Sequence, residues 1–231
     1  MSIYNHSNWK FDEAVAPIFD QHVRQSIPAY EGIQESVVHM TDFFCPQNAT
    51  VVDLGSATGE TLHRIQARHQ NKDLTLIGVD ESREMVKVAM GKVKGDTQYC
   101  WVPNRIQEYQ FPEKTDLVLA VLTLQFLEPD DREQVINRIY SKLKKGGAFL
   151  LVEKVYAESG RIQDIFNQIY HDQKEQAGFT TDEIRQKDQS IRGVMNPLTQ
   201  EDNEELLERA GFKQTEVFMK HFHFCGWLAI K

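Results

Sequence analysis

The sequence predicts an α/β fold: a doubly wound sheet of seven strands, preceded by helices and interrupted by a helical cap insertion. Two observations support this prediction. Between residues 50 and 155, short runs that are apolar throughout alternate with amphipathic stretches of helical spacing, the pattern that a parallel sheet covered on both faces requires. The aromatic-rich residues 213–231 then predict two final strands joined near residues 221–224.

The length and composition fit one globular domain. The chain has 231 residues, of which 41% are hydrophobic and 26% charged, and these values are ordinary for a protein with a sizeable core. We therefore predict a single domain over residues 1–231. Its four parts are N-terminal helices (1–45), a cofactor-binding core (46–155), a helical cap insertion (156–200) and a last helix with a strand hairpin (201–231).

The elements follow in order along the chain. Helical spacing on either side of Pro28 predicts two helices within residues 12–44. The core then predicts strands at 50–54, 74–80, 97–102, 115–124 and 147–155, and helices at 59–70, 82–93 and 131–143.

The strand–helix alternation stops after residue 155. Residues 161–179 and 180–194 both have helical spacing with no strand between them, so this insertion is well placed to cover the carboxyl edge of the sheet, where such folds bind ligands. A further helix over 199–212 is expected to end at Gly211 as its C-cap.

Charge and cysteine content exclude several function classes. The net charge of -8 argues against direct nucleic-acid binding, which depends on cations that neutralise phosphates. The loose run Lys142, Lys144 and Lys145 lies where a helix should end, and we interpret it as favourable to the helix dipole. The three cysteines have no metal-ligand spacing, so we expect no metal site and reduced thiols in a cytoplasmic protein. No segment approaches the roughly 20 apolar residues that span a bilayer.

The turn after the first strand, "DLGSATG", is the first candidate ligand site. Small residues at 55–57 and 59 let a ligand approach the backbone, and the following helix presents free N–H groups. Asp80, which ends the second strand, can accept hydrogen bonds from ribose hydroxyls. Its alternative is a helix N-cap, which Ser82 can provide instead. These features fit either a dinucleotide or S-adenosylmethionine (SAM).

The turn resembles the "DxGxGxG" motif of class I SAM-dependent methyltransferases, a Rossmann-like fold, and residues 116–154 resemble the fourth strand, helix and fifth strand of that fold. The resemblance implies SAM as cofactor, with Gly55, Ser56 and Ala57 at its methionine end, Asp80 at the ribose and Arg105-Ile106 at the adenine. The further cofactor-binding candidates are Asp53, Gly59, Glu81 and Val121.

A closer resemblance covers nearly the whole chain. The segments "FDEAVAPIFDQHVRQSIPAY", "TLQFLEP" and "IYHDQKEQAGFTTDEI" are similar to the CmoA-like family, methyltransferase-fold enzymes that make carboxy-SAM from SAM and prephenate for tRNA wobble-uridine modification. The resemblance implies that Tyr30 contacts the cofactor and that the protein is a homodimer formed through the cap helices. As an alternative, Tyr30 is a wedge between the two N-terminal helices.

Two residues depart from that family. It has an arginine for the added carboxylate after a "QK" pair, where this chain has Asp188, and an asparagine where this chain has Val121. Because a carboxylate repels a carboxylate, these departures favour methylation of a small polar molecule, such as an amino acid or secondary metabolite, over carboxy-SAM synthesis. Arg185 or Arg192 could restore the missing charge. A third alternative is a SAM-binding regulatory subunit without catalysis.

Methyl transfer requires alignment of the acceptor and, for many acceptors, a base. The candidates are His171, which titrates near neutrality when unperturbed, Tyr170 and Glu153. The cap insertion and the segment "NHSNWKF" are expected to enclose the substrate and exclude water. His221 and His223 alternate with phenylalanines and are expected to face outward from the last strand.

Overall fold

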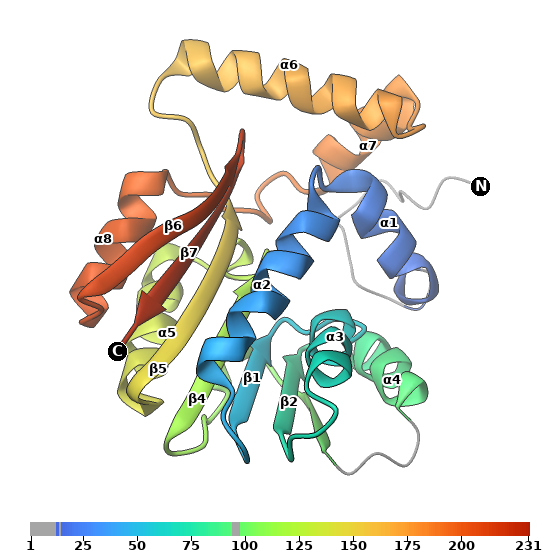
Figure 1. Ribbon diagram of the computed structural model, residues 1–231. Helices are drawn as coiled ribbons and strands as arrows, with labels where there is room; N and C mark the ends of the chain where they lie inside the picture. The colour runs from blue at the N-terminus through green and yellow to red at the C-terminus, as the bar shows by residue number, and fades with distance from the viewer. Residues whose placement is uncertain (1–12, 14, 94–97) are drawn as a thin grey trace.

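A computed structural model describes residues 13, 15–93 and 98–231. Predictions that fall on residues 1–12, 14 and 94–97, including the "NHSNWKF" segment, lie outside these ranges. The described chain forms one seven-stranded sheet in the order β3-β2-β1-β4-β5-β7-β6, with helices on both faces (Figure 1). The predicted doubly wound α/β class and the strand number are confirmed.

The sheet is parallel from β3 to β5, and β7 then runs antiparallel to both β5 and β6. Apolar side chains of β1, β2, β4 and β5 are buried on both faces, so each face must be covered by helices. The strands are β1 (Thr50–Leu54), β2 (Thr75–Asp80), β3 (Tyr99–Pro103), β4 (Thr115–Val121), β5 (Leu143–Lys154), β6 (Gln214–His221) and β7 (Phe224–Ile230).

Two core clusters lie on opposite faces of the sheet. On one face, α2 (Tyr30–Phe44) and α3 (Glu60–Arg68) contribute Ile33, Val37, Leu62 and Ile65. On the other, α5 (Pro129–Lys142) and α8 (Gln200–Ala210) pack their aliphatic residues against β4 and β5. The helix α4 (Arg83–Lys92) packs beside β2 and β3. The carboxyl ends of β1, β2 and β4 are thereby left to be closed by other segments.

The N-terminal helices separate where Pro28 predicted a break. The first, α1 (Phe19–Ser26), ends two residues before Pro28, and α2 begins two residues after it. Between them Ala29 has the left-handed φ of 60°, which ends one helix axis and starts another. Figure 1 shows α1 displaced from α2 toward α3 and α4.

The insertion forms the two expected helices, α6 (Gly160–Gln176) and α7 (Thr181–Ser190). Thr180 and Glu183 make a capping box at the start of α7, which fixes where that helix begins. In Figure 1, α6 crosses above the upper end of the sheet and leads to α7 beside α1. The insertion therefore covers the carboxyl edge, as predicted.

One local prediction is confirmed, one is confirmed in part and one is wrong. Gly211 ends α8 with a φ of 113°, and a Cβ there would lie 2.8 Å from the Tyr140 ring. Of the basic run, Lys142 lies in the last turn of α5, as expected, whereas Lys144 and Lys145 lie at the start of β5 and Lys144 lies 2.6 Å from Asp116. His223, expected to face outward, is instead 1% exposed in the turn between β6 and β7. Within the described ranges, no helix is both long and apolar enough to cross a membrane.

Candidate active site

The turn between β1 and α3 adopts a conformation that favours small residues. Gly55, Ala57 and Gly59 all have positive φ, of 68°, 46° and 78°, and β-branched residues are strained there. A Cβ on Gly55 would lie 2.4 Å from the side chain of Thr123, which follows β4. The glycine at 55 therefore makes room for Thr123, and the turn lines a cavity with Gly55, Ser56 and Ala57.

Asp80, at the end of β2, holds this turn in place. Its Oδ2 accepts a hydrogen bond from Ala57 N at 2.9 Å, and its Oδ1 accepts one from Ser82 N at 2.8 Å. The N-cap of α4 is Ser82, which accepts a hydrogen bond from Met85 N, and not Asp80, as expected. Burial raises the pKa of Asp80. A carboxylate at this position still has lone pairs for a ribose diol.

Asp53 lies beneath the same turn at the end of β1. It is 2% exposed, and burial together with the charge of Asp80 raises its pKa to about 8. Two desolvated carboxyl groups create a demand for a cation, which the sulfonium and ammonium groups of SAM would supply. Ser56 Oγ, also buried here, has no partner within the described residues. These features fit SAM.

These groups surround a cavity of about 340 Å³. Most of the predicted site residues line it: Tyr30, Asp53, Gly55, Ser56, Ala57, Asp80, Glu81, Arg105, Ile106, Val121 and Tyr170. Gly59, His171 and Glu153 do not line it. A Cβ at Gly59 would meet the Trp101 ring at 2.3 Å, so this glycine serves packing on the other side of the turn.

Three lysines meet at the cap end of the cavity: Lys154 from the end of β5, Lys174 from α6 and Lys187 from α7. Burial and the charge of Lys174 lower the pKa of Lys154 to about 8 and that of Lys187 to about 6. Burial thus disfavours the charged form of these lysines until further counter-charge is brought to them. An anion at this end of the cavity would supply it.

Asp188 follows Lys187 and also reaches this wall. Its Oδ2 lies 3.0 Å from His171 Nε2, and its Oδ1 lies 3.6 Å from Lys174 Nζ. The carboxylate that was expected to repel an anionic ligand is therefore flanked by donors from α6. The same contact corrects the prediction for His171, which is directed to Asp188 and lies outside the cavity wall.

Tyr170 lines the cavity, but its hydroxyl is engaged elsewhere. It donates a hydrogen bond to Ser26 O at 3.0 Å. The Nζ atoms of Lys154 and Lys174 lie 4.8 Å and 4.2 Å from its ring centroid, in cation–π contact. The geometry thus indicates that Tyr170 orients two lysines, instead of the predicted role as a base.

Glu153 is the third predicted base, and the structure corrects it too. It is 1% exposed and accepts a hydrogen bond from Leu124 N at 3.0 Å. Burial raises its pKa to about 8. Because side chains alternate along a strand, Glu153 points into the core while its neighbour Lys154 reaches the cavity. Glu153 therefore supports the loop after β4 and cannot touch a bound substrate.

Comparisons with known proteins agree with this fold. A family model described as "Methyltransferase domain" matches residues 51–147. The carboxy-S-adenosyl-L-methionine synthase of Staphylococcus epidermidis is 39% identical over 229 residues, covering 99% of both chains. That of Nautilia profundicola is 34% identical, covering 96% of this chain and 94% of the relative. The plantazolicin methyltransferase BpumL in complex with SAH has a TM-score of 0.67 at 12% identity, covering 95% of this chain and 91% of that one, and shares the fold.

Proposed function

Because the chain belongs to the carboxy-S-adenosyl-L-methionine synthase family, we propose that it carboxylates the methyl group of SAM to give carboxy-SAM. SAM is its cofactor. Full-length similarity to enzymes of that name supports this reaction over the methylation of a small polar molecule, which the sequence alone favoured. It also weighs against a regulatory subunit without catalysis.

The observation that carries the proposal is the group of lysines at the cap end of the cofactor cavity. Lys154, Lys174 and Lys187 line this end together with Asp188, whose carboxylate contacts Lys174 and His171. The product of methyl carboxylation differs from SAM by one carboxylate beside the sulfonium. A site where three ammonium groups lie together favours this group, whereas transfer of a neutral methyl group gives it no anion to bind.

When bound, SAM supplies a sulfonium that makes the adjacent methyl C–H bonds more acidic. Carboxylation breaks one of these C–H bonds and forms a C–C bond to carbon dioxide. The family resemblance implies prephenate as donor. Its aromatisation releases carbon dioxide and hydroxide, and the hydroxide takes up the methyl proton, so no protein base is required.

The chain contributes binding, orientation and the exclusion of water. Lys154 and Lys187 are placed to hold the carboxylates of the donor and of the product. Val121, at the position of the family's asparagine, has an apolar side chain. We infer that the lysines make the polar contacts at this end. The cap and α1 shield the cavity, which strengthens these charge interactions.

The test is turnover of purified protein with SAM and prephenate, followed by mass spectrometry of the nucleoside product. We expect carboxy-SAM only when both substrates are present. Methylated products formed from small-molecule extracts, with no carboxy-SAM from prephenate, would instead support the methyltransferase alternative.

The expected homodimer and cytoplasmic location stay predictions. Ile162 and Ile165 of α6 are 44% and 45% exposed, and they lie on the cap through which the resemblance implies dimer formation. Light scattering of the purified protein would measure the oligomeric state directly.

A further inference from the structure

The helix α1 forms part of the wall of the cofactor cavity. Phe19, His22 and Val23 line the cavity from this helix, and Ser26 and Ile27 line it from its end. On the cap side, Tyr170 donates its hydroxyl to Ser26 O, and the His22 ring packs edge-on against Phe179 at 5.9 Å. A ligand in the cavity is consequently covered by α1, and it can leave on this side only if α1 moves.

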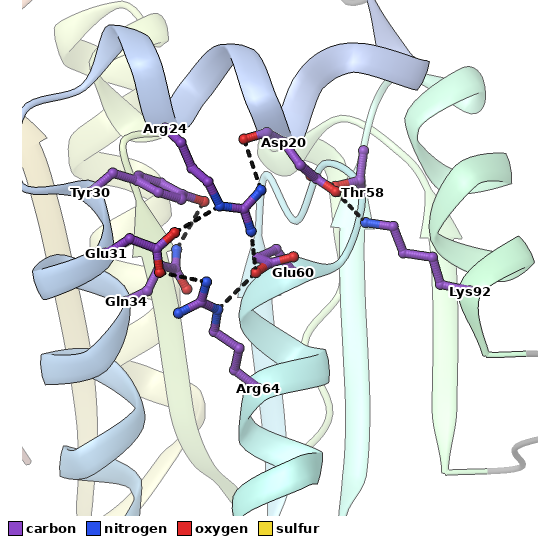
Figure 2. Close-up of polar contacts among 9 residues, drawn as sticks. All are labelled: Asp20, Arg24, Tyr30, Glu31, Gln34, Thr58, Glu60, Arg64 and Lys92. Carbon is purple, nitrogen blue, oxygen red and sulfur yellow. Dashed lines mark hydrogen bonds and ion pairs between the residues drawn. The ribbon is translucent and has the colours of Figure 1, made fainter. Parts of the chain in front are cut away.

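On its opposite side, α1 is fastened by four charged residues, which we call the charge ring: Arg24, Glu31, Glu60 and Arg64. Arg24 of α1 donates to Glu31 of α2 and to Glu60 of α3, both at 2.7 Å. Arg64 of α3 donates to the same two carboxylates at 2.8 Å. Figure 2 shows the two guanidinium groups and two carboxylates alternating around a closed circuit that joins three helices.

A second attachment holds the start of α1. Asp20 Oδ2 lies 2.6 Å from Lys92 Nζ of α4, and Asp20 Oδ1 accepts a hydrogen bond from Thr58 of the glycine turn. Arg24 also donates to Asp20 O at 3.0 Å (Figure 2). The ionic attachments of α1 on this side thus reach the turn of the cofactor cavity.

Among the described residues, these attachments add to a small apolar contact, in which Phe19 packs against Val15, Ala16 and Met85. The helix α1 has eight residues, of which only His22 and Ser26 are buried, and so short a helix is unstable without tertiary contacts. The charge ring is partly exposed, with side-chain exposures of 36% for Arg24 and 51% for Glu31. Single exposed ion pairs contribute little, but a network of several charges contributes more, and salt screens all of them.

We infer that Arg24 is a positioning residue for cofactor binding: through the charge ring it holds α1 over the cavity and limits the rate at which SAM enters and leaves. Arg24 does not line the cavity and needs no contact with the ligand. This inference goes beyond the proposed carboxylation, because it concerns cofactor exchange in any reaction of this site.

The experiment measures dissociation of S-adenosylhomocysteine from the full-length protein by displacement with excess SAM. Arg24→Met keeps the aliphatic stem and removes the charge, and we expect dissociation to become about two- to fivefold faster. In the unmodified protein, added sodium chloride should also speed dissociation, and Arg24→Met should reduce this salt dependence.

The matched control is Arg68→Met. Arg68 also lies on α3 and pairs with Asp42 of α2, at 2.5 Å, but this pair does not touch α1 or the cavity. Its loss should leave the dissociation rate and its salt dependence unchanged. Glu31 is the partner of Arg24 that does not line the cavity. Glu31→Gln removes its charge and should act like Arg24→Met, and it replaces that variant if Arg24→Met does not fold.

The inference is overturned if S-adenosylhomocysteine leaves Arg24→Met and Glu31→Gln at the same rate as the unmodified protein, or if Arg68→Met speeds its release as much as Arg24→Met does. It is also overturned if release from the unmodified protein is independent of salt. These measurements contain no prephenate, the proposed donor of the carboxyl group. A failure of the proposed carboxylation would therefore leave their outcome unaffected.

Discussion

His171 Nε2 lies 3.0 Å from Asp188 Oδ2, so a carboxylate at the edge of the cofactor cavity is held by the cap helix that crosses above it. Lys174 approaches the other oxygen at 3.6 Å. The sequence suggested that Asp188 would exclude a carboxylated cofactor. With its charge offset by these neighbours and by Lys154 and Lys187, that objection loses its physical basis.

Removal of Lys154 should weaken binding of the carboxylated product selectively. Lys154→Met keeps the chain length and deletes the ammonium group, and the loss of a charged hydrogen bond predicts about ten- to a hundredfold weaker binding of carboxy-SAM by calorimetry. S-adenosylhomocysteine, which lacks the carboxylate, should bind as before. Lys145→Met, at the opposite end of the same strand, is the control. Equal losses for both ligands would show that Lys154 supports the fold and does not bind the anion.

Neutralising Asp188 should have little effect. If its charge is already offset, Asp188→Asn should change the affinity for carboxy-SAM by less than about threefold, within the range of a surface ion pair. A direct clash between two carboxylates predicts the opposite, a gain of tenfold or more on neutralisation, and such a gain would contradict our description of the cap end.

Binding of carboxy-SAM should depend on pH through the lysines. The pKa of Lys154 is lowered to about 8 and that of Lys187 to about 6. A bound carboxylate favours the ammonium form and raises both values, so binding near pH 7 should take up protons. Affinity should fall as the pH rises through about 8, and Lys154→Arg, which stays charged, should flatten that fall. Calorimetry in buffers of different ionisation enthalpy measures the uptake, and its absence would refute the charge assignment.

Asp80 should affect SAM, S-adenosylhomocysteine and carboxy-SAM alike. Asp80→Asn removes an acceptor for the ribose and weakens the bond from Ala57 N, so each ligand should bind about tenfold or more weakly. Asp73→Asn, an exposed position just before the same strand, should have no effect. If only the affinity for carboxy-SAM fell, Asp80 would act at the carboxylate end of the cavity and not at the ribose.

Glu153 should influence stability more than catalysis. Its pKa is raised from 4.5 to about 8 in the fold, so between these values the folded protein keeps a proton that the unfolded chain has lost. The stability that this residue contributes therefore falls as the pH rises through that window. Glu153→Gln should remove this fall, giving a more stable protein near pH 8 with activity retained. Urea denaturation at several pH values gives the free energy of unfolding of both proteins. The same dependence on pH in both, or a stable variant without activity, would contradict this prediction.

The fold and the cofactor half of the site could be predicted because their signals are local. The turn from residue 53 to 59 and the acid at residue 80 each lie where a strand leads into a helix, and the break at Pro28 lies between two helices. Each of these signals can be recognised within a few residues, although the contacts that they make, such as that of Asp80 with Ala57 N, are longer in sequence. The structure confirms the fold class and brings most of the predicted cofactor residues to one cavity.

The cap half could not be predicted because its residues come from separate elements. Whether Lys154 or Glu153 faces the cavity depends on the phase of a strand buried on both faces, which its apolar pattern leaves undetermined. Similarly, the pairing of His171 with Asp188 depends on how α6 and α7 cross. Sequence spacing alone placed His171 on a helix without indicating its partner.

The central claim is that the site makes and holds a carboxylated cofactor. The most direct test is the mass of the nucleoside that co-purifies with the protein after expression in cells that contain both SAM and prephenate. We predict a species heavier than SAM by one carbon dioxide, which is lost from the Lys154→Met variant. Recovery of only unmodified SAM or S-adenosylhomocysteine, with no carboxy-SAM formed on adding prephenate, would contradict the claim.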